Sequence, residues 1–237
     1  LATVAALNYK NGLDNPLAHF GKGGPSDRLG LTSPEAILNL PPEKNPIIAQ
    51  PLRLHDCSLV TDGAAALVIA SSDSSLSRGE KAVRIAGIGH ANERIAISAR
   101  PNMYELMAGK VAVARAFAEA GISIRDVDIA EVHDCFTINQ LLCTEALGLS
   151  ADGRAGYDYM DGRFGRDDPT CAVNLSGGLK AKGHPVGATG VSMNVLLYKQ
   201  LVGRAIGAVP VGKKPQVGVS LNVGGSSVTN CVTVLKR

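Results

Sequence analysis

The sequence of 237 residues lacks tryptophan, long apolar runs and blocks of like charge. No apolar stretch reaches the roughly 18 to 20 residues that cross a bilayer, so we expect no membrane span. The 24 Lys and Arg residues and 21 Asp and Glu residues are spread along the chain, which argues against nucleic acid as a partner. With 45% hydrophobic and 19% charged residues, the composition excludes a disordered or collagen-like chain and predicts a globular protein with a sizeable core.

The five cysteines form no CxxC pair and do not have the Cys/His spacing of a zinc site. We therefore expect neither a disulfide framework nor a metal site. The odd number favours a reducing compartment, which is the cytoplasm or, in a eukaryote, the mitochondrial or peroxisomal matrix. We expect Cys143, Cys171 and Cys231 to be packing residues.

Strands and helices are expected to alternate along the chain. Apolar runs predict strands at 64–70, 83–89, 128–132, 216–223 and 230–236. Helical spacing and glycine terminators predict helices at 2–11, 34–40, 104–120, 137–147 and 189–202. The run AAALVIA at 64–70 is continuous, which is typical of a strand covered on both faces. This order predicts an α/β fold, a layered sheet with helices on both faces.

Three junctions at strand ends carry reactive side chains, and ligands of α/β sheets bind at such places. The first junction is His133-Asp134-Cys135-Phe136, between a predicted strand and a predicted helix. An imidazole and a thiol two residues apart can point into one cleft there, and the helix N-terminus favours the thiolate. The alternative is a buried cysteine and a histidine bonded to the backbone.

The other two junctions are rich in glycine. One runs from Asn174 through Gly178 to the segment Gly183-His184-Pro185, whose tight backbone must approach something closely. The last is Asn222-Val223-Gly224-Gly225, where free backbone N–H groups can stabilise a developing oxyanion, unless it is a plain turn between two strands.

Together the junctions supply what carbanion chemistry at an acyl thioester requires. The imidazoles of His133 and His184 can hold a water or donate to the thioester oxygen, which acidifies the α-carbon. The thiol or thiolate of Cys135 can then move the proton. These residues do not reveal the nucleophile.

The chain resembles the C-terminal part of a thiolase, most closely the sterol-carrier-protein type and its bacterial and archaeal relatives. The resemblance rests on HDCF at 133–136, NLSGGLKAKGHPVGATG at 174–190 and Gly224-Gly225, with support from 15–20 and 56–71. It implies the layered αβαβα thiolase fold. Residues 83–237 would form the C-terminal βαβαβαββ domain, and residues 1–82 the end of the N-terminal half with part of its loop region.

The resemblance also implies roles for individual residues. Catalytic roles fall on His133, Cys135, His184 and Gly224: the imidazoles bind the thioester oxygen, Cys135 acts as acid and base, and Gly224 donates from a second oxyanion hole. His184 would also activate the nucleophilic cysteine. Substrate contacts are implied for a further set, Phe136, Asn174, Ser176, Gly177, Gly178 and Asn222. Asn222 stands where the family has its second catalytic cysteine.

The activity implied by the resemblance is that of an acyltransferase in lipid and fatty acid metabolism. It cleaves 3-ketoacyl-CoA with CoA or condenses two acyl-CoA molecules, with coenzyme A as substrate and no metal or other cofactor. The region 21–51, with Lys180 and Lys182, would approach the CoA phosphates. The family's acyl-accepting cysteine lies upstream of these residues, and Cys57 cannot replace it. We therefore expect the chain alone to be inactive, and the full-length form to be a homodimer or tetramer.

Two alternatives stay open. One is a thiolase-like aldolase that cleaves a steroid side-chain CoA thioester together with a small partner subunit. The other is a non-catalytic subunit that holds acyl-CoA or a lipid.

Overall fold

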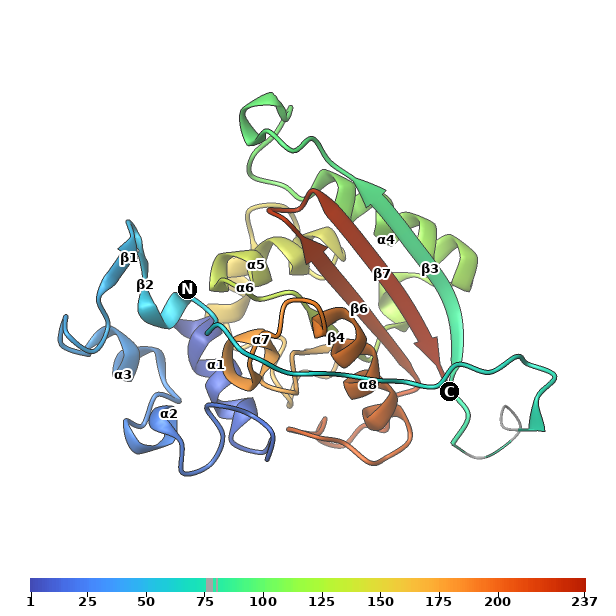
Figure 1. The fold of residues 1–237 in the computed structure, drawn as a ribbon, viewed down its shortest axis with the longest axis horizontal. Helices are drawn as coiled ribbons and strands as arrows, with labels where there is room; N and C mark the ends of the chain where they lie inside the picture. The colour runs from blue at the N-terminus through green and yellow to red at the C-terminus, as the bar shows by residue number, and fades with distance from the viewer. Residues whose placement is uncertain (76–78, 80) are drawn as a thin grey trace.

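A five-stranded mixed sheet forms the centre of the molecule (Figure 1). The computed structural model describes residues 1–75, 79 and 81–237. The strand order is β3-β7-β6-β4-β5, in which β7 is antiparallel to β3 and β6, and β4 is parallel to β5 and β6. The strands are β3 (Arg84–Asn92), β4 (Ile129–Val132), β5 (Ala172–Val173), β6 (Val217–Gly224) and β7 (Thr229–Lys236).

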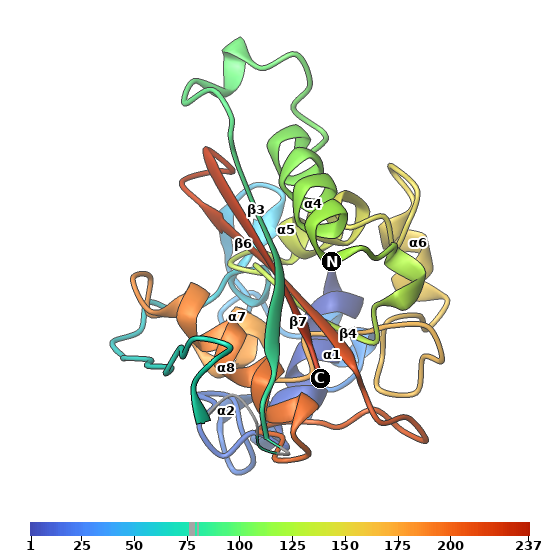
Figure 2. The ribbon, with the colours of Figure 1, turned by 90° about the vertical axis from the view of Figure 1, so that its right-hand side faces the viewer.

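Helices cover both faces of this sheet. Figure 2, which views the sheet nearly edge-on, shows α4 and α5 on one face and α7 and α8 on the other. These four helices are α4 (Met107–Ala120), α5 (Thr137–Ala146), α7 (Gly178–Lys182) and α8 (Thr189–Leu201). Along the chain the larger elements follow in the order β3-α4-β4-α5-β5-α8-β6-β7. The predicted βαβαβαββ order and the α/β class are therefore confirmed.

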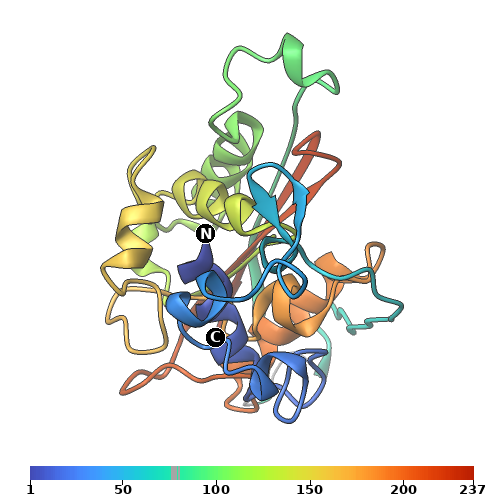
Figure 3. The same cartoon turned by 90° about the vertical axis from the view of Figure 1, so that its left-hand side faces the viewer.

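The N-terminal segment covers one end of the sheet, as Figure 3 shows. Its elements are α1 (Ala2–Gly12), α2 (Pro25–Arg28), α3 (Pro34–Leu38), β1 (Ile47–Ala49) and β2 (Leu52–Arg53). The helices predicted at 2–11 and 34–40 are confirmed, whereas α2 and the hairpin β1–β2 were not predicted. A further short helix, α6 (Ala155–Met160), follows α5.

Glycine lets α4 lie close against β3. A Cβ atom on Gly89 would be 1.8 Å from the carbonyl oxygen of Ala112, and one on Gly87 would be 2.2 Å from that of Ala116. Any side chain at either position would push the helix away from the strand. At its end, α4 stops at Gly121, which has the left-handed φ of +62° that a glycine terminator adopts.

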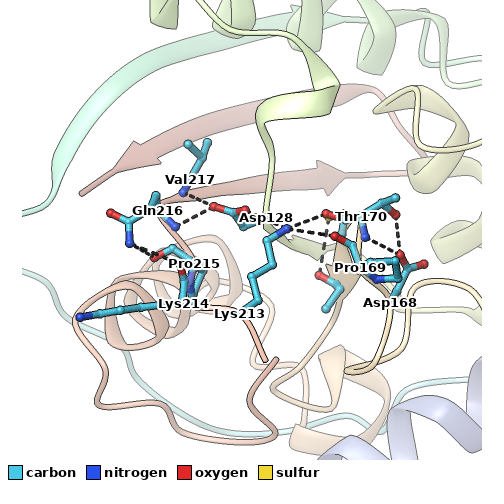
Figure 4. A network of polar contacts seen from close by, with 11 residues as sticks. Asp128, Asp168, Pro169, Thr170, Lys213, Lys214, Pro215, Gln216 and Val217 are labelled. Carbon is cyan, nitrogen blue, oxygen red and sulfur yellow. Dashed lines mark hydrogen bonds and ion pairs between the residues drawn. The ribbon is translucent and has the colours of Figure 1, made fainter. Parts of the chain in front are cut away.

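A polar network fixes the starts of β4 and β6 (Figure 4). Asp128 Oδ2 accepts hydrogen bonds from the backbone N–H groups of Gln216 and Val217, at 2.7 and 2.9 Å. Lys213 Nζ lies 2.8 Å from Asp128 Oδ1 and donates to the carbonyl oxygen of Thr170 at 2.9 Å. These contacts hold the amino ends of β4 and β6 together, and because the two strands are parallel, their carboxyl ends also lie side by side.

The strand predicted at 64–70 is wrong. This stretch runs without regular structure across the molecule in Figure 1, and Val68 and Ile69 are 89% and 69% exposed. A strand needs a neighbour for its backbone N–H and C=O groups, and the residues that the structure describes offer none beside it. The apolar run thus has the composition of a covered strand but lacks the layer that would cover it.

Three further observations concern the sequence predictions. Cys143 and Cys171 are buried as predicted for packing residues, but Cys231 is exposed on β7, so its prediction is wrong. The helix expected from 104 begins only at Met107. Within the described ranges, no helix combines the length and the apolar character that a bilayer crossing requires.

Candidate active site

The carboxyl ends of β4 and β6 bring two of the three junctions together. Val132 and Leu221 are partners in the parallel pair, so the residues that follow them lie side by side. His133 Nδ1 is 2.9 Å from Asn222 Oδ1. The ring of His184, from the loop before α8, meets the ring of His133 edge-on, with centroids 5.0 Å apart and planes at 89°. His133, His184 and Asn222, three of the predicted site residues, therefore converge.

Both imidazoles are held neutral at physiological pH. His133 is 6% exposed, and this burial lowers its pKa to about 4, with further lowering by His184 and Lys182 against the raising effect of the Asn222 hydrogen bond. Burial, together with the charge of Lys182, also lowers the pKa of His184. Its Nδ1 lies 2.7 Å from Thr189 Oγ1. Neutral rings can each donate one hydrogen bond and accept another.

Cys135 lies on the loop that leads from β4 into α5. Its carbonyl oxygen accepts a hydrogen bond of 2.8 Å from Ser58 N–H, and the next residue, Phe136, forms a bridge with Cys57. Burial raises the pKa of the Cys135 thiol to about 11, and the charge of Asp134 adds to the effect. The backbone N–H groups of Cys135 and Phe136, just before α5, lower this pKa, in the direction expected at a helix N-terminus, but burial outweighs them. Phe136 is 41% exposed beside this loop.

A buried carboxylate that the sequence analysis missed fastens this loop to α7. Asp134 accepts hydrogen bonds from the backbone N–H groups of Leu179 at 2.7 Å and Lys180 at 3.1 Å, and from Asn8 Nδ2 at 2.8 Å. Burial raises its pKa to about 6, although these N–H groups and the Lys182 charge oppose the effect. A Cβ atom on Gly178 would be 2.2 Å from Asp134 Oδ2, so only glycine fits there.

The remaining residues of the Asn174–Gly178 turn also make contacts within the protein. Ser176 donates to the buried Glu131 from its N–H at 3.1 Å and its Oγ at 2.7 Å. Asn174 Oδ1 accepts from Val132 N–H at 2.8 Å. Gly177 lies against α1, where a Cβ atom would be 2.8 Å from Gly12 Cα. The turn is fully buried, and the substrate contacts expected of its residues stay a prediction.

Glu131 is the second acidic residue that the sequence analysis missed. It lies in β4, and burial raises its pKa to about 7 against the lowering effects of Ser176 and Lys182. Sequence signals for both acids existed, since each lies within two residues of His133. The positions of Glu131 and Asp134 in the sequence did not show that their hydrogen-bond donors would come from the glycine-rich turn and the start of α7.

Two surface hollows adjoin segments that contain predicted site residues. One, of about 420 Å³, lies between the extended stretch 61–65 and the loop that follows His184. The other, of about 510 Å³, lies at the far end of β6 and is lined by Gly224 together with Ile95, Ile97 and Val228. Gly224 is exposed at the last position of β6, two residues beyond Asn222, and its predicted oxyanion role stays a prediction.

The prediction that Lys180 approaches a CoA phosphate is wrong. Its side chain is 1% exposed, and its ammonium lies over the rings of Tyr9 and Phe20, 4.7 and 5.2 Å from their centroids. Burial lowers its pKa to about 8. Lys182 Nζ lies near the Gly183 carbonyl oxygen at 3.3 Å and Ser192 Oγ at 3.4 Å. Aromatic faces attract a buried cation, so the Lys180 ammonium is stabilised inside the protein and does not reach the surface.

The corner formed by these loops can bind a carbonyl oxygen and move a proton at the neighbouring carbon. It holds two neutral imidazoles and one amide, and the half-buried Cys135 lies on the adjoining loop between β4 and α5. In the described part of the chain, no group of three or more His, Cys, Asp or Glu side chains is arranged to hold a metal ion.

Comparison with known proteins gives consistent results. A family model described as "Thiolase C-terminal domain-like" matches residues 89–237. An acetyl-CoA acetyltransferase of Methanothermobacter thermautotrophicus is 34% identical over 241 residues, covering 100% of this chain and 58% of that protein. Sterol carrier protein 2 of Oryctolagus cuniculus is 31% identical over 234 residues, covering 96% of this chain and 40% of that protein. The chain thus spans about half the length of these curated relatives.

A solved structure named "Ltp2-ChsH2(DUF35) aldolase" superposes with a TM-score of 0.81 at 18% identity. The superposition covers 100% of this chain and 57% of that chain. At this identity the likeness concerns the fold.

Proposed function

Since the chain belongs to the thiolase family, we propose that it supplies the enolising part of a thiolase-type acyltransferase site that acts on acyl-CoA thioesters. The observation that carries this proposal is the meeting of the His133 and His184 rings, 5.0 Å apart, at the carboxyl ends of parallel strands. Two imidazoles at one point can stabilise the oxygen of a thioester while its α-carbon loses a proton.

The residues divide the work in this proposal. The imidazole corner holds the thioester oxygen, and the thiolate form of Cys135 takes the α-proton, which leaves the enolate charge on that oxygen. The enolate carbon then attacks the carbonyl carbon of a second acyl thioester, and as the carbon–carbon bond forms the carbon–sulfur bond of that thioester breaks and its thiolate leaves. In the reverse direction a thiolate attacks the ketone carbon, the carbon–carbon bond breaks, and the enolate that is released takes its proton from Cys135. His184 takes the proton of the attacking thiol, and Gly224 donates its backbone N–H to the second oxygen. Asp134 and Glu131 position the loop after β4 and the Asn174–Gly178 turn through their hydrogen bonds to α7 and Ser176.

We further propose acyl-CoA and CoA as the ligands, and a homodimer or tetramer as the full-length form. The named activity of the archaeal relative supports the ligands. The name of the structural neighbour, which joins two components, supports a small partner subunit. We place the division between the two thiolase halves at 82/83, and the start of the family model at residue 89 supports it.

Exchange of the α-protons of acetyl-CoA tests this proposal, because enolisation needs no acyl-accepting cysteine. In D₂O the methyl signal of acetyl-CoA should disappear about 10²-fold faster with the chain than in buffer, the low end of general acid–base catalysis. Cys135→Ser and His184→Ala should abolish the gain. Cys171→Ser is the matched control, because Cys171 directly precedes β5 at the amino ends of the parallel strands, away from the imidazoles at their carboxyl ends. Exchange no faster than in buffer, or equal exchange in Cys135→Ser, would refute the proposal.

A further inference from the structure

Asn222 is held between an imidazole and a glycine. Its Oδ1 lies 2.9 Å from His133 Nδ1. On the other side, a Cβ atom on Gly190 would be 2.9 Å from Asn222 Nδ2 and 3.4 Å from its Cγ. Gly190 belongs to the first turn of α8, and Asn222 lies in β6 two residues before its last residue, Gly224. The absence of a side chain at Gly190 therefore makes the space in which this amide lies.

The contact determines where the hydrogen of His133 resides. An amide oxygen only accepts hydrogen bonds, so the ring nitrogen that faces it must carry a hydrogen. A neutral imidazole has a single N–H, and burial keeps His133 neutral above a pKa of about 4. The hydrogen on Nδ1 therefore leaves Nε2 with a free lone pair.

We propose that Asn222 is a positioning residue that holds His133 in the Nδ1–H tautomer, so that Nε2 accepts a hydrogen bond from a water molecule. The second hydrogen of that water is then available to the thioester oxygen, a step that rests on the function proposed above. Asn222 thus acts through His133. It has this role at the place where the family resemblance puts a cysteine that transfers protons.

His184 has the same tautomer for a related reason. The hydroxyl of Thr189 donates its hydrogen to the carbonyl oxygen of Pro185 at 3.1 Å, so it accepts from His184 Nδ1–H at 2.7 Å. Both rings then present bare Nε2 atoms, so in the resting protein each holds the thioester oxygen through a water molecule rather than directly. When His184 Nε2 takes the proton of a thiol, the thiol becomes a thiolate and the ring becomes an imidazolium. Its new Nε2–H then points to the oxyanion.

Two-bond ¹H–¹⁵N spectra of the imidazoles in the free chain at pH 8 test the proposal. A bare ring nitrogen resonates far from a protonated one, and the loss of one signal set in His133→Gln assigns His133. We expect a bare Nε2 in the wild-type chain and in Asn222→Asp, which keeps an acceptor oxygen. Asn222→Ala should move the hydrogen to Nε2. The control is Asn194→Ala, since Asn194 bonds Gly190 and Ser220 and should leave the His133 signals in place.

A protonated Nε2 on wild-type His133, or an unchanged tautomer in Asn222→Ala, would overturn the proposal. If Asn222→Ala does not fold, the wild-type and Asn222→Asp spectra still decide. These spectra are recorded without acyl-CoA, so the result does not depend on the proposed function. A bare Nε2 without α-proton exchange refutes that function alone. Exchange with a protonated Nε2 refutes the tautomer alone.

Discussion

Gly178→Ala tests how the acidic residue beneath the site holds the two loops together. Gly178 begins α7 with a φ of +60°, in the left-handed region that residues with a side chain avoid. The new Cβ atom would be 2.2 Å from Asp134 Oδ2. The carboxylate must then retreat from Leu179 N–H and Lys180 N–H, its backbone donors in α7.

The expected loss of stability follows from these two effects. The left-handed conformation costs an alanine roughly 1–2 kcal/mol. Weakening the charged hydrogen bonds of a buried carboxylate costs about 1–3 kcal/mol more. We therefore expect the free energy of unfolding to fall by about 3 kcal/mol, which for a chain of this length lowers Tm by roughly 6–12 °C.

Urea unfolding followed by circular dichroism measures this change. The matched control is Gly187→Ala in the same glycine-rich motif, because a Cβ atom on Gly187 would have no atom within 4 Å. Its φ is not in the left-handed region, so the control should match the wild type or gain up to about 1 kcal/mol. If Gly178→Ala is as stable as Gly187→Ala, the contact between Gly178 and Asp134 does not constrain the loop as described.

Two further predictions concern protons. The rate of α-proton exchange, after subtraction of the rate in buffer, should rise with pH towards about 11, because Cys135 gains its base form there. It should have no inflection from His133 near 6.5, since that ring is neutral above a pKa of about 4; such an inflection, lost in His133→Gln, would contradict the assignment. Lys180→Met should raise the free energy of unfolding at pH 7 by about 1–3 kcal/mol. Burial lowers the pKa of Lys180 from 10.5 to about 8, so folding disfavours its ammonium form. The aromatic faces of Tyr9 and Phe20 offset part of that cost. The wild type loses the cost of burying the ammonium as pH rises from about 8 to 10.5, so the urea midpoints of the two proteins should converge over this range. A difference in midpoint that stays constant with pH would contradict the lowered pKa of Lys180.

The sequence identified four of the five strands, because each has a local apolar pattern and also has strands and helices that cover it; β5 has only two residues and shows no such pattern. The strand at 217–224 and the helix from 189 have their partners within the described residues, so local apolar patterns and packing agree. The run at 64–70 has the same local apolar pattern, but no described strand lies beside it to pair with its backbone. Tertiary packing, rather than the local pattern, determines whether such a run becomes a strand.

The site was predictable in part for a similar reason. His133 and Asn222 lie at or near the carboxyl ends of β4 and β6, and parallel strands bring these ends together whatever the loops do. His184 reaches them from the loop between α7 and α8. The structural role of Asp134 depends on the turn of a distant segment, which no spacing in the sequence reveals. Lys180 looked like a surface lysine because its aromatic neighbours, Tyr9 and Phe20, come from more than 150 residues away.

The extended stretch from Cys57 to Thr61 touches both reactive loops at once. Ser58 bonds the backbone of Cys135, Val60 forms a bridge with His184, and Thr61 Oγ1 accepts from His184 N–H at 3.2 Å. The two loops therefore do not lose their conformational entropy separately, since one short tether restrains both. Thermal loosening of this tether would misalign the thiol and the imidazole together, and slowed amide hydrogen exchange at Ser58 and His184 should appear or vanish as a single event.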